Sequence, residues 1–291
     1  MRGWPVGIRR QRSIVISHNQ SGGKSRGRSL DSLGANVKIA TWNVNSIRSR
    51  LDRLLAWLAA NRPDVVCLQE LKVVEADFPS EAIEAAGYTA VVHGQKTYNG
   101  VAILSREPLR GTVRGFQVGP ADAEARLISA RLDDVTVLSA YAPNGQQVGS
   151  EKWAYKLDWL ARLRDHLARH HRPDEPLVLC GDLNVARDDR DVARPADWSD
   201  SVLCRAEARA ALEELIGWGL VDLVRRRHPD GGVYTWWDYR MLAFPKNNGL
   251  RLDYILATEP LAERCVGAEV DRRQRKGEKP SDHAPVVAEF A

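Results

Sequence analysis

The fold of this 291-residue chain is decided by PLVLCGDLN, residues 176–184, taken together with VKIATWNVN, residues 37–45. Each stretch begins as an apolar run of the length that is typical of a buried β-strand. Each run ends in a polar residue that is followed two positions later by an asparagine, as Asp182 is by Asn184. The repetition predicts two similar halves, and two β-sheets packed face to face with helices outside would accommodate it.

Further strands are predicted wherever a short apolar run is bounded by polar or turn residues. These runs are DVVCLQE (64–70), GVAILS (100–105), ARLISARL (125–132), VTVLSAY (135–141), LRLDYILA (250–257) and HAPVVAEF (283–290). The short spacing between 125–132 and 135–141 indicates a hairpin, so the sheets must be antiparallel or mixed. The predicted class is therefore α/β (α+β), with two packed mixed sheets flanked by helices.

Three amphipathic helices are predicted from apolar residues that recur at helical spacing. The first follows residues 37–45, is ended by Pro63 and has an apolar face of Leu51, Leu54, Leu55 and Leu58. The second covers 151–170 and directs Trp153, Leu157, Leu160 and Leu167 to the core. The third covers roughly 206–218 and stops at Gly219.

The basic character of the chain comes from its first 36 residues. Of 42 Lys and Arg residues, seven lie in 1–36 beside one acid, which leaves 35 basic against 37 acidic residues in 37–291. The net charge of +4 is thus no evidence for nucleic-acid binding by the body of the chain. Residues 1–36 are rich in Arg, Ser and Gly without apolar periodicity, so we expect a disordered basic leader; a transit peptide is the alternative.

The cysteines and the apolar runs limit the class of protein further. The four cysteines lie far apart, at 67, 180, 204 and 265, without the paired spacing of a zinc or redox site. We expect buried, reduced thiols and a cytoplasmic location. No apolar run reaches the roughly 18 residues that a membrane span requires, so no membrane association is expected.

Polar side chains collect at or just after the ends of the predicted strands. These residues are Asn43, Asn45, Gln69, Glu70, Tyr141, Asn144, Asp182, Asn184, Asp253, Asp282 and His283. Taken singly, Asn and Asp at such places are ordinary turn and cap residues. A glutamate that ends a buried strand needs another explanation, because burying its charge is costly. The coincidence at six strand ends indicates one site at a common edge of the sheets.

The chemistry that suits this collection is metal-assisted hydrolysis of a phosphodiester. Carboxylates and amide oxygens without cysteine select a hard cation such as Mg²⁺ or Mn²⁺. A cation and an imidazole can stabilise charge on phosphoryl oxygens while a separate carboxylate activates water. No phosphate-binding loop of the nucleotide-triphosphate type is present in the sequence. Ser281 adjoins Asp282 and His283, but adjacency in sequence does not make a catalytic triad.

Seven motifs together resemble those of the exonuclease III family. In chain order they are TWNVNSIR (41–48), VVCLQELK (65–72), AYAPNG (140–145), GDLNVA (181–186), TWWDYR (235–240), GLRLDYIL (249–256) and KPSDHAPV (279–286). This family contains bacterial abasic-site endonucleases and 3′ exonucleases of the wider endonuclease/exonuclease/phosphatase fold. The resemblance covers about residues 37–291. It implies a single catalytic domain, a four-layer α/β sandwich, and a monomeric DNA-repair phosphodiesterase that acts on duplex DNA with abasic sites or 3′ ends.

The resemblance also implies a role for each matching position. Glu70 would be the principal metal ligand, with Asn43 and Asp282 near the metal. Asp182 would polarise the attacking water, and Asn184 would orient the water or the phosphate. His283 would bind the scissile phosphate, held in place by Asp253, and Tyr141 would contact the phosphate or assist the leaving oxygen. The residues implied around the ion are thus Glu70, Asn43, Asp182, Asn184, Asp282 and His283, and Mg²⁺ is the implied ion, with Mn²⁺ as its substitute.

The substrate class depends most on TWWDYRMLAFPKNNGLRLD, residues 235–253. This stretch resembles a loop of the DNA-repair branch, in which Trp236 and Leu250 would form an apolar niche for a sugar that lacks its base. Asn144 would be a further substrate contact. Trp236 and Trp237 could instead be ordinary core aromatics. Phosphatases and phosphodiesterases that act on inositol phosphates or lipids also resemble this chain at GDLN and SDH. A non-catalytic DNA-binding module is the alternative from another class. Such a module would be expected to have lost at least one site carboxylate, and none is missing from this sequence.

Overall fold

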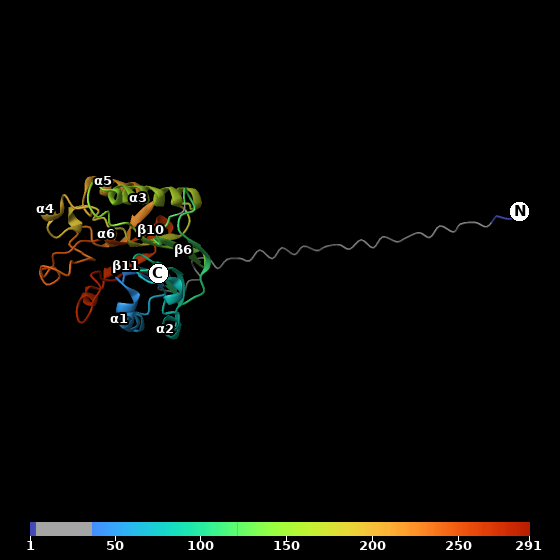
Figure 1. Cartoon of the computed structure of the whole chain (residues 1–291), viewed down its shortest axis with the longest axis horizontal. Coiled ribbons are helices and arrows are strands. Elements are labelled where there is room, and N and C mark those ends of the chain that lie inside the picture. The colour runs from blue at the N-terminus through green and yellow to red at the C-terminus, as the bar shows by residue number, and fades with distance from the viewer. Residues whose placement is uncertain (4–36, 121) are drawn as a thin grey trace.

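The computed structural model describes residues 1–3, 37–120 and 122–291, and two six-stranded sheets organise them (Figure 1). The first sheet has, in spatial order, β11 (Cys265–Val270), β12 (Val286–Phe290), β1 (Val37–Asn43), β2 (Val65–Gln69), β4 (Val101–Ser105) and β3 (Thr89–His93). The second has β5 (Arg110–Arg114), β6 (Leu127–Leu132), β7 (Val135–Tyr141), β8 (Leu177–Asp182), β10 (Asp253–Thr258) and β9 (Leu220–Asp222). Residues 4–36, which make up nearly all of the expected leader, lie outside the described residues.

Each sheet is mixed, and its single parallel pair lies at the centre. β1 runs parallel to β2 with Asn43 opposite Gln69, and β7 runs parallel to β8 with Tyr141 opposite Asp182. Parallel neighbours finish at the same edge of a sheet, which brings the polar strand ends together in pairs. β10 is antiparallel to β8, so that its first residue, Asp253, pairs with the last residue of β8, Asp182.

Helices cover the outer face of each sheet and complete four layers. Figure 1 shows α1 (Ile47–Asn61) and α2 (Ser80–Ala85) on one side, and α3 (Glu151–His170) and α5 (Ala206–Ile216) on the other. One apolar core lies between the sheets and contains Val65, Val137 and Ile255. A second core packs α1 against the first sheet through Trp42 and Trp57. The predicted four-layer α/β sandwich is confirmed.

Shorter elements connect these layers. They are the helices α4 (Pro195–Trp198), α6 (Leu223–Arg227) and α7 (Glu259–Ala262), and the 3₁₀ turns η2 (Glu75–Asp77), η3 (Asp189–Asp191) and η4 (Arg272–Arg275). The two long helices begin at serine caps, because Ser46 accepts from the Ser49 N–H and Ser150 from the Trp153 N–H. Within the described residues, no helix is long and apolar enough to cross a membrane.

The structure departs from the predicted strands at two places that matter for the site. β10 begins at Asp253 rather than at residue 250, because Leu250 forms isolated bridges with Val192 and Trp236 instead. β12 begins at Val286 rather than at residue 283, because His283 also pairs with Trp236. The four edge strands β3, β5, β9 and β11 were not predicted, since each offers only a short apolar run.

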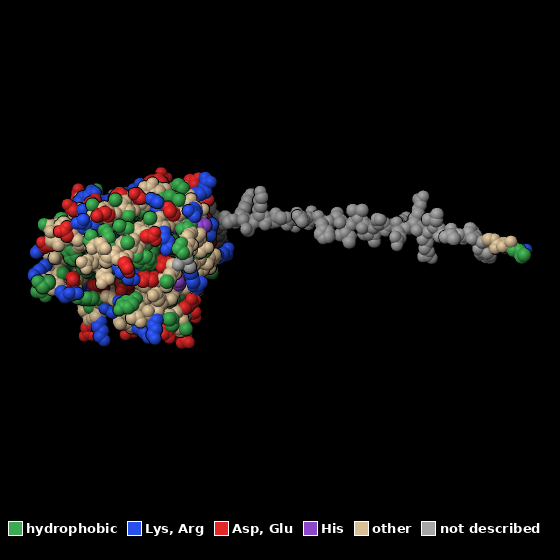
Figure 2. Space-filling view, turned by 45° about the horizontal axis from the view of Figure 1, so that its top comes forward, with side chains coloured by type: hydrophobic (Ala, Val, Ile, Leu, Met, Phe, Trp, Pro, Cys, Tyr) green, Lys and Arg blue, Asp and Glu red, His purple; other side chains and the backbone are tan. Residues whose placement is uncertain are grey.

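Two further expectations concern burial and charge. Trp237 is a core aromatic that packs with Ala243, Ala284 and Phe244, which confirms the interpretation of this residue as part of the core. All four cysteines are free and buried, as expected. Figure 2 shows basic and acidic side chains interspersed over the visible face, in keeping with the near balance of 35 basic and 37 acidic residues in 37–291.

Candidate active site

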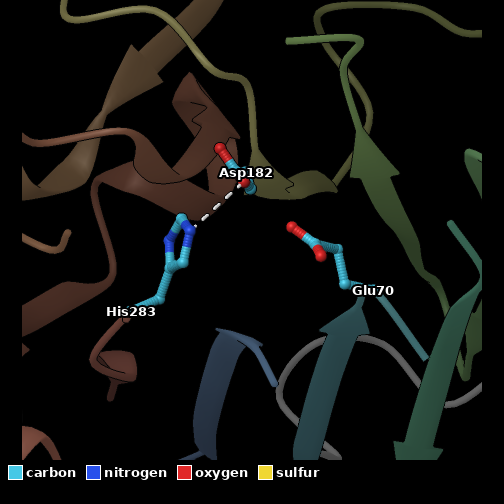
Figure 3. A group of neighbouring side chains, drawn as sticks. All are labelled: Glu70, Asp182 and His283. Carbon is cyan, nitrogen blue, oxygen red and sulfur yellow. Dashed lines mark ion pairs between the residues drawn. The ribbon is translucent and has the colours of Figure 1, made fainter. Parts of the chain in front are cut away.

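Three metal-ligating side chains converge at the edge where the central strands end. Glu70 follows β2, Asp182 ends β8, and His283 precedes β12; one ligand atom from each lies within 4.8 Å of the other two. Figure 3 shows the three side chains pointing toward one another from the two sheets. The site therefore forms at the interface of the sheets, and residues from both halves of the chain are needed to build it.

Glu70 is held by donors on both of its carboxylate oxygens. Its Oε1 accepts from the Asn43 Nδ2 at 2.8 Å and from the Tyr141 hydroxyl at 2.9 Å. Its Oε2 pairs with the Lys72 ammonium at 2.8 Å. The backbone of Glu70 has a φ of +53°, a left-handed conformation that turns the chain away from β2 directly after the strand ends. These contacts orient the carboxylate toward Asp182.

Asp182 is buried and shares a donor with Glu70. The Asn43 Nδ2 that bonds Glu70 also donates to the Asp182 Oδ2 at 2.9 Å, and the Asn184 N–H donates to the Asp182 Oδ1 at 2.9 Å. Burial raises the pKa of Asp182 to about 7; the nearby positive charge of His283 opposes this shift. A carboxylate with this pKa can exchange a proton near neutral pH.

Asp253 and Asp182 hold the His283 ring between them. The ring Nδ1 lies 2.8 Å from the Asp253 Oδ2, and the Nε2 lies 3.7 Å from the Asp182 Oδ2, the pair marked in Figure 3. Burial alone would lower the pKa of His283, but the charges of Asp253 and Asp182 outweigh it and raise the pKa to about 10. The imidazole is therefore protonated at neutral pH.

The Tyr141 hydroxyl is a hydrogen-bond donor to Glu70 and stays protonated. Burial raises its pKa well above the ordinary value, and the charges of Glu70 and Asp182 add to that shift. The Arg126 guanidinium lies 4.8 Å from the centre of the Tyr141 ring, and its Nη1 donates to the Tyr141 carbonyl at 3.1 Å. Tyr141 can therefore donate a proton or a hydrogen bond but does not carry a negative charge at neutral pH.

Asp282 lies outside the three-residue group and belongs to a neighbouring network. Its Oδ1 accepts from the Asn45 Nδ2 at 2.9 Å and its Oδ2 from the Trp236 Nε1 at 3.0 Å. Burial opposes ionisation of Asp282, but the charge of His283 and these hydrogen bonds lower its pKa below the usual value. The Lys72 Nζ donates to the Asn45 Oδ1 at 2.5 Å, so the network leads back to Glu70.

The two residues expected to form the substrate niche differ in exposure. Trp236 is half-buried, meets the Trp198 ring edge-on with 5.7 Å between ring centroids, and exchanges two backbone hydrogen bonds with Leu250. The Leu250 side chain is fully buried and supports Trp236 from behind. Asn144 lies on the other side of the site, where its Nδ2 donates to the Asn184 Oδ1 at 3.2 Å.

Sequence reasoning missed two lysines that hold this site together. Lys72 stands two residues after Glu70 in VVCLQELK, where a basic residue beside a candidate metal ligand is a usable signal. Lys156 is fully buried and bonds the Asn184 carbonyl at 2.7 Å. It lies on the face of α3 that buries Leu160 and Leu163, and its place in that apolar pattern was the available signal.

The donor set fits a hard divalent cation. Two carboxylates, those of Glu70 and Asp182, meet within reach of a single ion beside the protonated His283 ring, and cysteine is absent from this group. Hard cations such as Mg²⁺ prefer carboxylate and amide oxygens, whereas a protonated imidazole can only donate hydrogen bonds. The side-chain oxygen of Asn43 accepts from the Asn45 N–H at 3.0 Å, which leaves its Nδ2 between Glu70 and Asp182.

Comparison with known proteins agrees with this geometry. Residues 40–283 match the Endonuclease/Exonuclease/phosphatase family. Exodeoxyribonuclease III of Haemophilus influenzae is 36% identical over 266 residues, which cover 87% of this chain and 100% of that protein. An AP endonuclease from Archaeoglobus fulgidus superposes with a TM-score of 0.85 at 44% identity, covering 87% of this chain and 99% of that one. The 3′ phosphatase NExo from Neisseria, bound to a product DNA hairpin, superposes with a TM-score of 0.84 at 40% identity, covering 88% and 99%.

The chain therefore belongs to the endonuclease/exonuclease/phosphatase family. Its relatives place it among the exodeoxyribonuclease III-type hydrolases, so it is a nuclease of DNA repair that cleaves phosphodiesters. The resemblance found in the seven sequence motifs is confirmed. The enzymes of this family depend on a metal, and the carboxylates of Glu70 and Asp182, which lie next to His283, can hold one.

Proposed function

We propose that this enzyme incises duplex DNA 5′ to abasic sites and removes nucleotides or blocking groups from 3′ ends. The observation that carries the proposal is the meeting of Glu70, Asp182 and His283 within 4.8 Å, beside the half-exposed Trp236. Solved relatives with similar chains are described as an AP endonuclease and as a 3′ phosphatase bound to a product DNA hairpin. We also propose that the enzyme acts as a monomer in the bacterial cytoplasm, on nucleoid DNA.

The proposed ion is Mg²⁺, with Mn²⁺ as a substitute. Glu70 would be its principal ligand, and Asn43, Asp182, Asn184, Asp282 and His283 would lie around it. Asp282 would act on the ion through the network of Asn45 and Lys72, because both of its oxygens accept hydrogen bonds from the protein. When bound, the cation offsets the negative charge of the phosphate beside two carboxylates.

Protein side chains would handle the proton and the orientation of the phosphate. Asp182 would accept a proton from the attacking water, for which its pKa of about 7 is suitable. Asn184 would orient that water, and protonated His283 would donate a hydrogen bond to a phosphoryl oxygen. The attack forms a new P–O bond and breaks the bond between phosphorus and the 3′ oxygen. Tyr141 would assist the departing oxygen, since its hydroxyl stays protonated.

Substrate choice would rest on the Trp236 side of the site. A sugar without its base exposes an apolar face, and an indole ring can pack against it where an intact nucleotide does not fit. Leu250 would act from behind Trp236, because its side chain is fully buried. Asn144 would contact the phosphate or the sugar from the opposite side, next to Asn184.

The test uses two duplexes, one with an abasic-site analogue and one with a recessed 3′ end. We expect cleavage of both with Mg²⁺ or Mn²⁺ and none in excess EDTA after dialysis. Glu70→Gln should reduce the rate strongly, whereas Glu289→Gln, at the far end of β12, should not. Activity on an inositol phosphate but not on the abasic duplex would contradict the proposal. Full activity in EDTA would contradict the metal mechanism.

A further inference from the structure

Lys156 is a buried cation whose partners are backbone carbonyls rather than carboxylates. The side chain is fully buried in α3. Its Nζ donates to the carbonyl oxygens of Asn144 at 3.1 Å, Asn184 at 2.7 Å and Val202 at 2.5 Å. Burial lowers the pKa of Lys156 to about 7, although the charge of Asp182 opposes that shift. An ammonium in such a place is costly, so a role beyond filling space is indicated.

The three carbonyls belong to three separate loops, and two of those loops carry site residues. Asn144 lies in the loop that follows β7, Asn184 in the loop that follows β8, and Val202 in the turn that precedes α5. Within the described residues, no other protein donor reaches these three oxygens. An apolar side chain of similar length could fill the space but would leave the buried carbonyls of Asn184 and Val202 without a partner.

Asn184 is the site residue whose backbone conformation this lysine supports. Its φ is +51°, a left-handed conformation that asparagine tolerates better than most residues other than glycine. Five hydrogen bonds hold it there. Its N–H and its Nδ2 donate to Asp182, its Nδ2 also donates to the Ala142 carbonyl, its Oδ1 accepts from Asn144, and its carbonyl accepts from Lys156. The bond from Lys156 is the one that satisfies the Asn184 backbone carbonyl, which would otherwise be buried without a partner.

Gly145 shows that the loop and the lysine are fitted to each other. It has a φ of +97°, and a Cβ placed there would lie 3.0 Å from the Lys156 Cδ and 3.2 Å from the Trp153 ring. The loop can approach the lysine stem this closely only because a glycine occupies the position. The glycine of the PNG motif thus serves the contact between this loop and α3.

We propose that Lys156 is a positioning residue of the active site, whose ammonium fixes the left-handed backbone of Asn184 and thereby the amide beside Asp182. The inference rests on the cleavage reaction proposed above. Lys156 does not reach the substrate, so its loss should slow the chemical step and leave DNA affinity nearly unchanged. A displacement of about 1 Å in a catalytic group can cost roughly a hundredfold in rate.

The experiment compares Lys156→Met with the control Thr258→Val. Thr258 is also fully buried and bonds a backbone carbonyl, that of Glu175, but it lies at the opposite end of β10 from Asp253. Single-turnover cleavage of saturating abasic duplex with Mg²⁺ should slow about 10- to 100-fold in Lys156→Met and remain normal in Thr258→Val. The dissociation constant for the duplex in EDTA should change less than about threefold. Thermal melting should show a loss of stability in both variants.

A double-mutant comparison separates positioning from general support. If Lys156 acts through Asn184, Lys156→Met combined with Asn184→Ala should be little slower than Asn184→Ala alone. A normal rate in Lys156→Met, or losses that multiply in the double variant, would overturn the proposal. Lys156→Gln keeps two N–H donors without the charge, so its single-turnover rate should lie between those of the wild type and Lys156→Met. It provides the rate comparison if Lys156→Met does not fold, and a wild-type rate in Lys156→Gln would then overturn the proposal.

A readout without substrate keeps this inference distinct from the proposed function. The NMR signals of the Asn184 backbone and side-chain amides should move in Lys156→Met or Lys156→Gln and stay in place in Thr258→Val. Unmoved Asn184 signals would refute the positioning role whatever the enzyme cleaves. A wild-type protein that cleaves neither duplex would count against the proposed function instead.

Discussion

Replacement of Asp253 by asparagine should lower the pKa of His283 by a large and measurable amount. The His283 Nδ1 lies 2.8 Å from the Asp253 Oδ2, and both side chains are buried. Within the described residues, the other oxygen of Asp253, Oδ1, has no hydrogen-bond partner. An amide nitrogen placed there therefore breaks no existing hydrogen bond, and the substitution removes the charge while keeping the shape.

The magnitude follows from the distance between the charges. Two unit charges about 4 Å apart attract by about 4 kcal/mol at an effective dielectric constant of about 20. Such an energy corresponds to about a thousandfold in proton affinity. The pKa of His283, about 10 in the native protein, should therefore fall to about 7 in Asp253→Asn.

The sign of the effect on stability follows from linkage. Because the folded-state pKa of His283 is raised to about 10, its stabilising contribution is complete below the ordinary histidine pKa of about 6.5. The contribution is lost as the pH rises through about 10. Asp253→Asn should therefore be less stable than the wild type at neutral pH, and the difference should shrink toward pH 10.

The assay is an NMR titration of ¹⁵N-labelled histidine in EDTA, with the His283 signal assigned from a His283→Gln variant. A His283 ring that remains protonated at pH 9 in Asp253→Asn would refute the electrostatic reasoning. Catalysis supplies a second check. If the two residues act as a unit, Asp253→Asn combined with His283→Ala should cleave no more slowly than His283→Ala alone. Strictly multiplicative losses would show that Asp253 works independently.

Three other perturbations test separate parts of the proposed site. Trp236→Ala should reduce the rate of abasic incision at least about tenfold. Trp236→Phe keeps an aromatic ring but loses the hydrogen bond to Asp282, so its rate should lie between those of the wild type and Trp236→Ala. A collapse of the melting temperature in Trp236→Ala would instead indicate a core role. Asp182→Asn should abolish cleavage yet stabilise the protein by about 2 kcal/mol at pH 8 in EDTA. Because the pKa of the buried Asp182 carboxyl is raised to about 7, the folded wild type loses stability as the pH rises through that value, and the variant does not. A variant that unfolds at a lower urea concentration than the wild type at pH 8 would contradict this. Deletion of residues 1–36 should leave the turnover rate at saturating DNA unchanged. It should weaken DNA binding at low salt, since seven basic residues and one acid are removed. A slower rate at saturating DNA would show that the segment takes part in catalysis.

Local sequence patterns were sufficient to predict the central strands and the residue types at their ends. β1, β2, β7 and β8 are buried over nearly their whole length, so each appears in the sequence as an apolar run. The polar residue that ends each run marks the place where the buried strand reaches the site. The edge strands β3, β5, β9 and β11 have only short apolar runs and could not be found in this way.

The long helices were predictable for the same reason, although one of their positions was not. The apolar face of α3 follows from the spacing of Trp153, Leu160 and Leu167. Lys156 lies on that face as well, but periodicity cannot show which acceptors surround a buried ammonium. Its three carbonyl partners come from three separate loops, up to 46 residues away in the sequence.

The amino-acid sequence by itself therefore determined which side chains are available for the chemistry and that each stands at the end of a buried strand. Only the tertiary structure decided which of them meet. Asp182 and His283 are joined by the packing of one sheet on the other, while Asp253 faces Asp182 through the antiparallel register of β10 against β8. The same packing placed Asp282 against Trp236 and Asn45 rather than in the three-residue group. Strand register and sheet packing depend on contacts between residues far apart in the chain, and no local pattern contains them.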